Sequence, residues 1–174
     1  MAIDAYLYFT QKASNGNCWP KGESLIQTDA ISISDSWAFA FENILDVTSL
    51  TTGGGSGKAE FQEFTVKKSV DKASAQLYLA IGAGAHFDGV QLVLAKTTGE
   101  TTNTSEIFLR WTFNMLVVER VSWSHADPHP EEEVMFRFGA CHIEYWQQDD
   151  KGRLKQIGDQ EWSQIANGPN MKTA

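Results

Sequence analysis

The side chains that could supply nucleophilic chemistry are few, and two of them are adjacent in the chain. Cys141 and His142 offer a thiol nucleophile and a base. They fall in an alternating, strand-like stretch, where neighbouring side chains point to opposite faces, so they cannot act together on one side. Cys141 is typical of a small core residue and His142 of a satisfied core or interface histidine. Cys18, next to Trp19-Pro20, is interpreted as an exposed loop thiol.

Metal-ligating residue types gather in one other stretch. His125, Asp127, His129 and Glu131–Glu133 follow one another closely, but two prolines hold the segment as a turn-rich acidic loop. No helix or strand sets the two histidines at a fixed spacing, and nothing supplies the outer hydrogen bonds that order metal ligands. The pattern favours a solvated loop over a metal site.

The glycine-rich stretch GGGSGK, Gly53–Lys58, suggests a phosphate-binding loop. That motif needs glycine where Thr52 stands and serine or threonine where Ala59 stands. It also needs a following helix whose amide groups face the anion, whereas a strand-like pattern follows here. The phosphate-loop interpretation is therefore rejected.

The remaining candidates do not form a catalytic site either. The acidic pair Asp149-Asp150 lies in a turn. Three of the six tryptophans, Trp37, Trp111 and Trp123, fall on apolar faces and are expected in the core rather than on a sugar-binding platform. The sequence predicts no catalytic residue, cofactor or metal ligand, and the protein is not expected to be an enzyme.

Length and charge limit the classes of protein further. The 174 residues favour a single domain over 1–174 with a substantial core. The net charge of -8, with no stripe of basic residues, argues against nucleic acid and anionic membranes as partners. The first ten residues lack the features of a secretory signal peptide, and the longest uncharged run, Ala73–Phe87, is too short to span a bilayer. One disulfide between the two cysteines is possible, but two free thiols in a protein made in the cytosol are favoured.

The element around which the chain is organised is the stretch Ser105–Ser124. Its residues alternate between an apolar and a largely polar face, which predicts a long β-strand with a bend or bulge near Glu119, where a charge interrupts the apolar face. Similar β-favouring patterns predict the other strands. They lie at Ala5–Thr10, Leu25–Phe41, Ala59–Val66, Val90–Thr97 and Val134–Gln147.

One segment has helical rather than strand spacing. Asp71–Gly84 repeats apolar residues at intervals of three and four, with Asp71 or Ser74 available to cap the start and Gly82 or Gly84 to end it. About 46–58 is expected to be an extended glycine-rich loop, and about 150–174 a C-terminal strand or tail. Together these elements predict a mainly β fold, a small β-barrel or sandwich of two sheets with one flanking α-helix.

The ordered set of motifs resembles the Hcp (haemolysin-coregulated protein) family, the tail-tube proteins of type VI secretion systems of Gram-negative bacteria. The resemblance runs through nearly the whole chain, and no single motif is diagnostic. It is carried by GES at Gly22–Ser24, ISISDSWAFAF at Ile31–Phe41, GGGSGK, FTVKKSVDKASAQLYLAIGAGAHF at Phe64–Phe87, VQLVLAKTTG at Val90–Gly99, LVVERVSWS at the end of the central stretch, IEYWQQD at Ile143–Asp149, and Trp162 with Asn167.

The resemblance implies a structural tube subunit. Homohexameric rings would stack into the inner tail tube, which a contractile sheath drives out of the cell with a spike protein at its tip, and effector proteins would travel in the lumen. The protein would be cytoplasmic when assembled and then secreted without a signal peptide, with roles in virulence and interbacterial competition. An alternative is a binding module in which the same barrel captures a polypeptide or small ligand without forming tubes.

Assembly contacts are assigned to the glycine-rich loop. A flexible segment of this kind buries little on its own and gains order by lying on a neighbouring subunit. Gly53, Gly54, Gly55, Ser56, Gly57 and Lys58 are therefore expected in subunit or ring contacts. Two segments depart from the family pattern: the connection Gln11–Lys21 is longer than usual, and HADPHPEEE at 125–133 is unusual. Both are expected to alter ring faces or cargo preference rather than the core.

Overall fold

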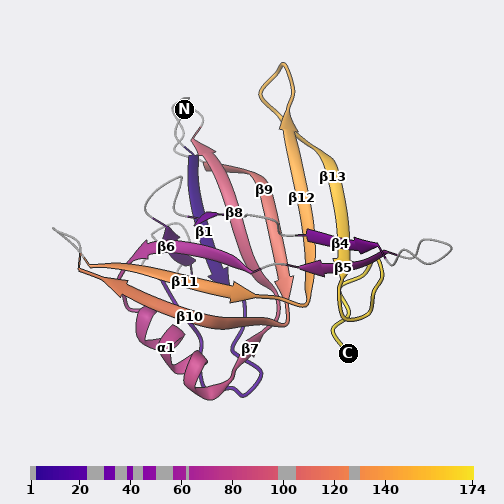
Figure 1. The fold of residues 1–174 in the computed structure, drawn as a ribbon. Helices are drawn as coiled ribbons and strands as arrows, with labels where there is room; N and C mark the ends of the chain where they lie inside the picture. Colours follow the sequence, from indigo (N-terminus) through magenta and orange to yellow (C-terminus); the bar gives the residue numbers. More distant parts are fainter. Residues whose placement is uncertain are drawn as a thin grey trace.

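The computed structural model (Figure 1) describes residues 3–22, 30–33, 39–40, 45–49, 57–61, 63–97, 105–125 and 130–174. Within these ranges the chain forms thirteen strands and one helix. In chain order they are β1 (Ile3–Phe9), β2 (Ala30–Ile33), β3 (Phe39–Ala40), β4 (Leu45–Ser49), β5 (Gly57–Phe61), β6 (Phe64–Ser69), α1 (Ser74–Ala83), β7 (His86–Phe87), β8 (Val90–Thr97), β9 (Ser105–Asn114), β10 (Leu116–Ser124), β11 (Glu131–Arg137), β12 (Ala140–Gln148) and β13 (Leu154–Ser163).

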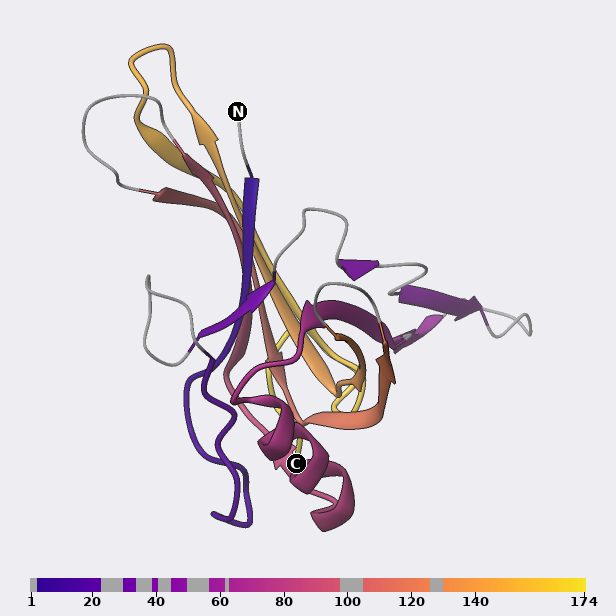
Figure 2. The same ribbon diagram turned by 90° about the vertical axis from the view of Figure 1, so that its left-hand side faces the viewer.

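The strands form two main antiparallel sheets and one separate hairpin. The six-stranded sheet has the order β13-β12-β9-β8-β1-β2, and the five-stranded sheet has the order β3-β6-β11-β10-β7. Strands β4 and β5 pair with each other as a two-stranded hairpin. The strands of the smaller sheet cross in front of the larger one in Figure 1, and α1 packs beside β10. Figure 2 shows the six-stranded sheet nearly edge-on. The predicted mainly β fold with two sheets and one flanking helix is confirmed.

One bent antiparallel ribbon belongs to both sheets. β9 pairs with β12 in the larger sheet, while β10 pairs with β11 in the smaller one. The bends lie at Met115, whose φ is +51°, and at Gly139, whose N–H donates to the Asn114 carbonyl at 3.1 Å. The predictions of single strands over Ser105–Ser124 and Val134–Gln147 were therefore wrong, because each segment leaves one sheet and enters the other. The predicted bulge near Glu119 is confirmed by a register shift between Val118 and Arg120.

The bend at Met115 reverses the faces expected for the second half of the central stretch. Leu116 and Val118, which strict alternation placed on the more polar side, are buried. Met115 and Trp123, expected on the apolar side, are 38% and 54% exposed. A left-handed residue changes the direction of the chain, so the alternation of side chains restarts beyond it. The expectation that Trp123 lies in the core was wrong.

Aromatic rings join the two sheets at the centre of the core. Phe64, on β6, stacks on Phe113 of β9 with ring centroids 4.7 Å apart, and on Phe136 of β11 at 5.2 Å. Phe138 contacts Phe64 and Phe113 at 5.8 and 4.8 Å. Because these rings come from both layers and are buried, they supply much of the apolar area that holds the sheets together.

The helix forms within the predicted segment and ends where expected. Gly84 adopts a left-handed conformation with φ of 59°, and backbone N–H groups of the cap reach the carbonyls of Ala80 and Ile81. The start differs from the prediction, because the N-cap residue is Ala73 and no side chain caps it. Asp71 and Ser74 instead hydrogen-bond to the turn before the helix, as described below.

Several other predicted segments divide into shorter strands. Within Leu25–Phe41 the structure describes β2 and β3, which belong to different sheets; Trp37 lies outside the described residues. Ala59–Val66 divides between β5 and β6. The segment 46–58, expected to be a loop, contributes most of β4 and the start of β5, so that part of the expectation was wrong. The C-terminal segment forms the long strand β13 before the chain ends.

Candidate functional site: assembly edges and a buried ion cluster

The β4–β5 hairpin is the element that carries the predicted assembly residues. Of these, Gly57 and Lys58 begin β5, where they lie opposite Ser49 and Thr48. Gly53, Gly54, Gly55 and Ser56 lie outside the described residues. The hairpin overlaps β13 in Figure 1, and the view in Figure 2 shows it to the right of the two main sheets. Its contact role stays a prediction.

Among the described strands, each main sheet ends in strands that pair on one side only. β13 and β2 are the edges of the six-stranded sheet, and β3 and β7 are the edges of the five-stranded sheet. β13 is ten residues long, so one side of it presents a long row of backbone donors and acceptors. An unpaired strand edge of this length can hydrogen-bond to a strand of another chain unless it is protected. The six-stranded sheet therefore has a different outer strand at each of its two ends.

Apolar side chains extend beyond the core on the inner face of the larger sheet. In the β9–β12 register, Cys141 lies opposite Phe113, Ile143 opposite Trp111, and Tyr145 opposite Leu109. Cys141 and Phe113 are buried, whereas Ile143 and Tyr145 are 41% and 38% exposed. The same face therefore continues from the core into solvent. Partly exposed apolar residues next to an open edge are typical of a surface that another subunit covers.

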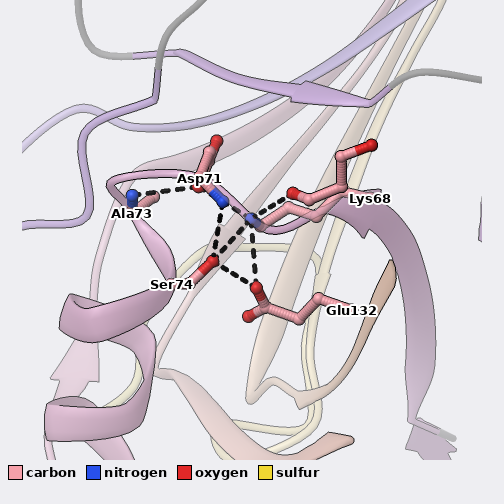
Figure 3. Close-up of polar contacts among 6 residues, drawn as sticks. Lys68, Asp71, Ala73, Ser74 and Glu132 are labelled. Atoms are coloured by element: carbon pink, nitrogen blue, oxygen red, sulfur yellow. Dashed lines mark hydrogen bonds and ion pairs between the residues drawn. The ribbon is translucent and has the colours of Figure 1, made fainter. Parts of the chain in front are cut away.

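A buried ion cluster lies where β6, β11 and the start of α1 meet (Figure 3). The Lys68 ammonium donates to Asp71 Oδ1 at 2.8 Å and to Ser74 Oγ at 3.2 Å, and lies 3.2 Å from Glu132 Oε2. The Ser74 hydroxyl donates to the same Glu132 oxygen. Lys68 is 3% exposed and Glu132 is 1% exposed.

Local geometry places each member of this cluster. Lys68 and Glu132 are cross-strand partners in the β6–β11 register, so they leave the sheet on the same face. Asp71 closes the turn before the helix by accepting the Ala73 N–H at 2.9 Å, while its own N–H donates to Ser74 Oγ at 3.1 Å. The cluster thus ties the start of α1 to both strands. Its polar groups are buried together, where losing one partner is costly.

Sequence reasoning missed the role of Glu132. It expected all of Glu131–Glu133 in a solvated acidic loop, but these residues begin β11. Alternation along that strand turns Glu132 inward, while Glu131 stays exposed and Glu133 is partly exposed. The sequence did contain a signal for this role. Lys68 lies on the same buried face of the strand as Phe64 and Val66, and a buried lysine needs an acidic partner. Of the loop candidates, Asp127 and His129 lie outside the described residues, and the described residues contain no cluster suited to a metal ion.

The nucleophile candidates are separated and buried. Cys18 and Cys141 are both free and both buried, so the expectation of free thiols is confirmed and the prediction of an exposed Cys18 was wrong. Burial raises the pKa of the Cys141 thiol to about 12 and also raises the pKa of Cys18. His142 Nε2 lies 2.5 Å from Asp159 Oδ1 on the neighbouring strand. Neither thiol is therefore activated as a nucleophile.

Both thiols are expected to resist alkylation in the folded protein. Iodoacetamide reacts with the thiolate, and burial disfavours the thiolate as well as access to it. At about pH 8 we expect labelling slower by about a hundredfold or more than in denaturant, because reaction needs local opening. Mass spectrometry of timed samples measures this. Rapid labelling of Cys18 alone would show that the loop after β1 opens independently.

No helix among the described residues is long and apolar enough to cross a membrane.

The fold is that of a two-sheet antiparallel β protein with one flanking helix. A family model described as "Type VI secretion system effector, Hcp" matches residues 9–145, and the chain belongs to this Hcp family. The match covers most of the chain, including the whole five-stranded sheet and the helix, whereas β13 and nearly all of β1 lie outside it.

Solved structures of similar fold agree with this assignment. One, described as a type six secretion system protein, is 22% identical, with a TM-score of 0.71 over 97% of this chain and 100% of that one. Hcp1 from Salmonella typhimurium is 22% identical, with a TM-score of 0.64 over 98% and 100%. A type VI secretion system effector from Yersinia pestis is 21% identical, with a TM-score of 0.60 over 92% and 99%. A comparison with curated proteins found no match.

Proposed function

We propose that this chain is the tube subunit of a type VI secretion system. It forms homohexameric rings, and the rings stack into the inner tail tube. Membership of the Hcp family across residues 9–145 is the observation that carries the proposal. The tube is assembled in the cytoplasm, enclosed by a contractile sheath, tipped by a spike protein and then secreted, and effector proteins travel in its lumen. The protein acts as a structural component rather than as an enzyme.

The open edges support a ring rather than a simple dimer. β13 and β2 are different strands at opposite ends of one sheet, so contact between them joins unlike surfaces. Head-to-tail contacts of this kind produce closed rings when the rotation between copies closes. The exposed Ile143 and Tyr145 lie next to the β13 edge and would lose their contact with water in such a ring.

Removal of the hairpin tip is expected to prevent assembly without unfolding the subunit. The Gly53–Gly57 deletion removes four of the seven residues that connect β4 and β5, together with the first residue of β5, and it removes no residue of the two main sheets. Light scattering should give about six times the 19.3 kDa chain mass for the parent protein and one chain mass for the variant. Negative-stain images should show rings with a central hole for the parent protein.

The folded state of the variant is the control for this experiment. Its thermal midpoint at low protein concentration should lie close to that of dissociated parent protein, because the deletion spares Phe61, the β5 residue that stacks on Phe138 of the core. If the deletion variant still forms hexamers, the proposed role of the hairpin in assembly is wrong, but the tube proposal is not contradicted. A parent protein that stays monomeric at high concentration would contradict the tube proposal itself and favour the binding-module alternative.

A further inference from the structure

The base of the β4–β5 hairpin is anchored to the aromatic core. In the described part of the chain, β4 and β5 pair with each other and with neither main sheet. Two strands alone are marginally stable in water, so the orientation of the hairpin depends on contacts at its base. Phe61, the last residue of β5, makes one such contact. It is 8% exposed, and its ring stacks on Phe138 with centroids 4.9 Å apart.

A hydrogen bond provides a second contact at the same residue. The Phe61 N–H donates to the side-chain oxygen of Gln164 at 2.7 Å. A ring stack fixes the distance of the hairpin base from the core but leaves rotation in the plane of the rings, whereas a backbone hydrogen bond has a preferred direction. Gln164 is therefore placed to set the angle at which the hairpin leaves the rest of the subunit.

Gln164 and Phe61 attach to adjacent residues of one bend. Phe138 holds the Phe61 ring, and the next residue, Gly139, accepts the Gln164 N–H at 2.9 Å. The side chain of Ile165 lies so close to Gly139 that a Cβ atom there would be 2.5 Å from Ile165 Cδ1. Glycine at this position thus permits the turn that carries Gln164 to lie directly on the bend.

That turn is held by the rest of the subunit independently of the hairpin. The backbones of Ser163 and Gly168 exchange two hydrogen bonds, at 2.8 and 3.2 Å. The Ser163 side chain is buried, and its hydroxyl donates to the Lys172 carbonyl. The Asn114 side-chain amide, at the end of β9, donates to the Met171 carbonyl at 3.1 Å. Gln164 therefore presents its side chain to β5 from a fixed support.

The same turn adjoins the open edge of the larger sheet. Gln164 directly follows Ser163, the last residue of β13, and β13 is an outer strand of the six-stranded sheet. The Gln164–Phe61 hydrogen bond thus relates two elements that are both candidates for contact with a neighbouring subunit. A copy that contacts both elements needs them at a fixed relative angle. Holding that angle before association lowers the entropy cost of binding.

We propose that Gln164 is a positioning residue for assembly, which holds the β4–β5 hairpin in the orientation that a second copy of this chain binds. This inference rests on the proposed role of the hairpin in ring formation. Without the hydrogen bond, the hairpin stays attached through the Phe61 ring but adopts several orientations. Ring formation must then order the hairpin, which weakens association.

A dilution series of the full-length protein tests this role. Sedimentation velocity measures the concentration at which half of the subunits are in rings. Gln164→Met keeps the length of the side chain and removes the acceptor, and it should raise this concentration by about three- to tenfold, the usual effect of one hydrogen bond. Gln164→Glu retains an oxygen at the same reach and should stay within about twofold of the parent protein. Gln164→Asn, whose amide is shorter, replaces Gln164→Met if that variant does not fold.

A second glutamine provides a matched control. The Gln76 side-chain oxygen on α1 accepts the Trp19 N–H at 3.3 Å, so Gln76→Met removes the same kind of bond from another part of the subunit. It should change the half-assembly concentration by no more than about twofold. Thermal melts at low protein concentration compare the stability of the two dissociated variants. Equal losses of assembly in Gln164→Met and Gln76→Met would show a general effect of stability and overturn the proposal.

Hydrogen exchange in the dissociated subunit gives a measurement that does not need rings. NMR should show the Phe61 amide exchanging about three- to tenfold faster in Gln164→Met than in the parent protein, with no such change in Gln76→Met. Unchanged exchange at Phe61 would overturn the proposal.

The two measurements distinguish failure of this proposal from failure of the tube proposal. Gln164→Met rings as stable as those of the parent protein would contradict the role of Gln164 and leave the tube proposal standing. A parent protein that stays monomeric would contradict the tube proposal and, with it, the assembly role of Gln164.

Discussion

Replacing Lys68 by methionine is expected to lower the free energy of unfolding by about 3–5 kcal/mol, the usual cost of removing one partner of a buried ion pair. Methionine keeps most of the side-chain volume but removes the positive charge. Glu132 would then be a buried carboxylate whose remaining described partner is the Ser74 hydroxyl, since its Oε1 has no hydrogen-bond partner in the structure. Urea denaturation should show a lower midpoint with a similar slope.

The neighbouring lysine provides a matched control for this substitution. Lys67 lies on the opposite face of β6, with its ammonium 3.7 Å from Glu133 and its side chain 52% exposed. Lys67→Met should change stability by no more than about 0.5 kcal/mol, as exposed ion pairs contribute little. If Lys68→Met lowered the free energy of unfolding as little as Lys67→Met, the buried ion cluster would not be what ties the start of α1 to β6 and β11.

A double substitution separates charge from packing. Lys68→Met/Glu132→Leu removes both principal charges and replaces them with apolar side chains of similar size. Such replacements of a buried ion pair are often neutral, so the double variant should be more stable than Lys68→Met alone. A double variant less stable than either single variant would instead point to loss of the hydrogen bonds around Ser74.

Replacing Phe64 by alanine is expected to cost about 3–5 kcal/mol, the range for truncating a buried phenylalanine. Phe64 is 1% exposed and stacks on rings from both sheets, at 4.7 Å from Phe113 and 5.2 Å from Phe136. Removal of its ring leaves a cavity at the contact between the layers, which neither sheet can close without moving the other. Thermal or urea denaturation at a protein concentration low enough to dissociate the assembly measures the loss.

An exposed aromatic residue serves as the comparison. Tyr78 on α1 is 65% exposed, and Tyr78→Ala should stay within about 0.5 kcal/mol of the parent protein. Phe64→Leu, which retains more of the buried volume, should cost less than Phe64→Ala. A loss below about 1 kcal/mol for Phe64→Ala would mean that the core collapses readily around the site and that the two sheets are not held by these rings.

Periodicity predicted the elements that follow local rules. The segments now seen as β1, β8 and α1 were expected within a few residues, because their apolar spacing matches a strand or a helix throughout. The bulge near Glu119 was also expected, since a charge interrupts an apolar face there. These features depend on neighbouring residues alone.

The bends could not be predicted in the same way. A methionine with φ of +51° has no sequence signature, and a single left-handed residue reverses every later assignment on the strand. Burial of Glu132 depends on Lys68, which is distant in sequence, so the acidic run resembled a solvated loop. Cys18 is buried because its loop folds back on β1 and β7, and composition does not reveal such tertiary contacts. The contacts of Gly53–Lys58 stay a prediction.

The ribbon that bends at Met115 and Gly139 has a consequence for how the subunit comes apart. The ribbon contributes interior strands to both sheets, β9 and β12 to one and β10 and β11 to the other. Unfolding of either sheet therefore also disrupts the ribbon that forms part of the other sheet. Backbone amides of β9 and β11 should therefore exchange their hydrogens with solvent water at one common opening free energy, rather than in two stages. We therefore expect a subunit built in this way to resist mechanical load as one cooperative unit.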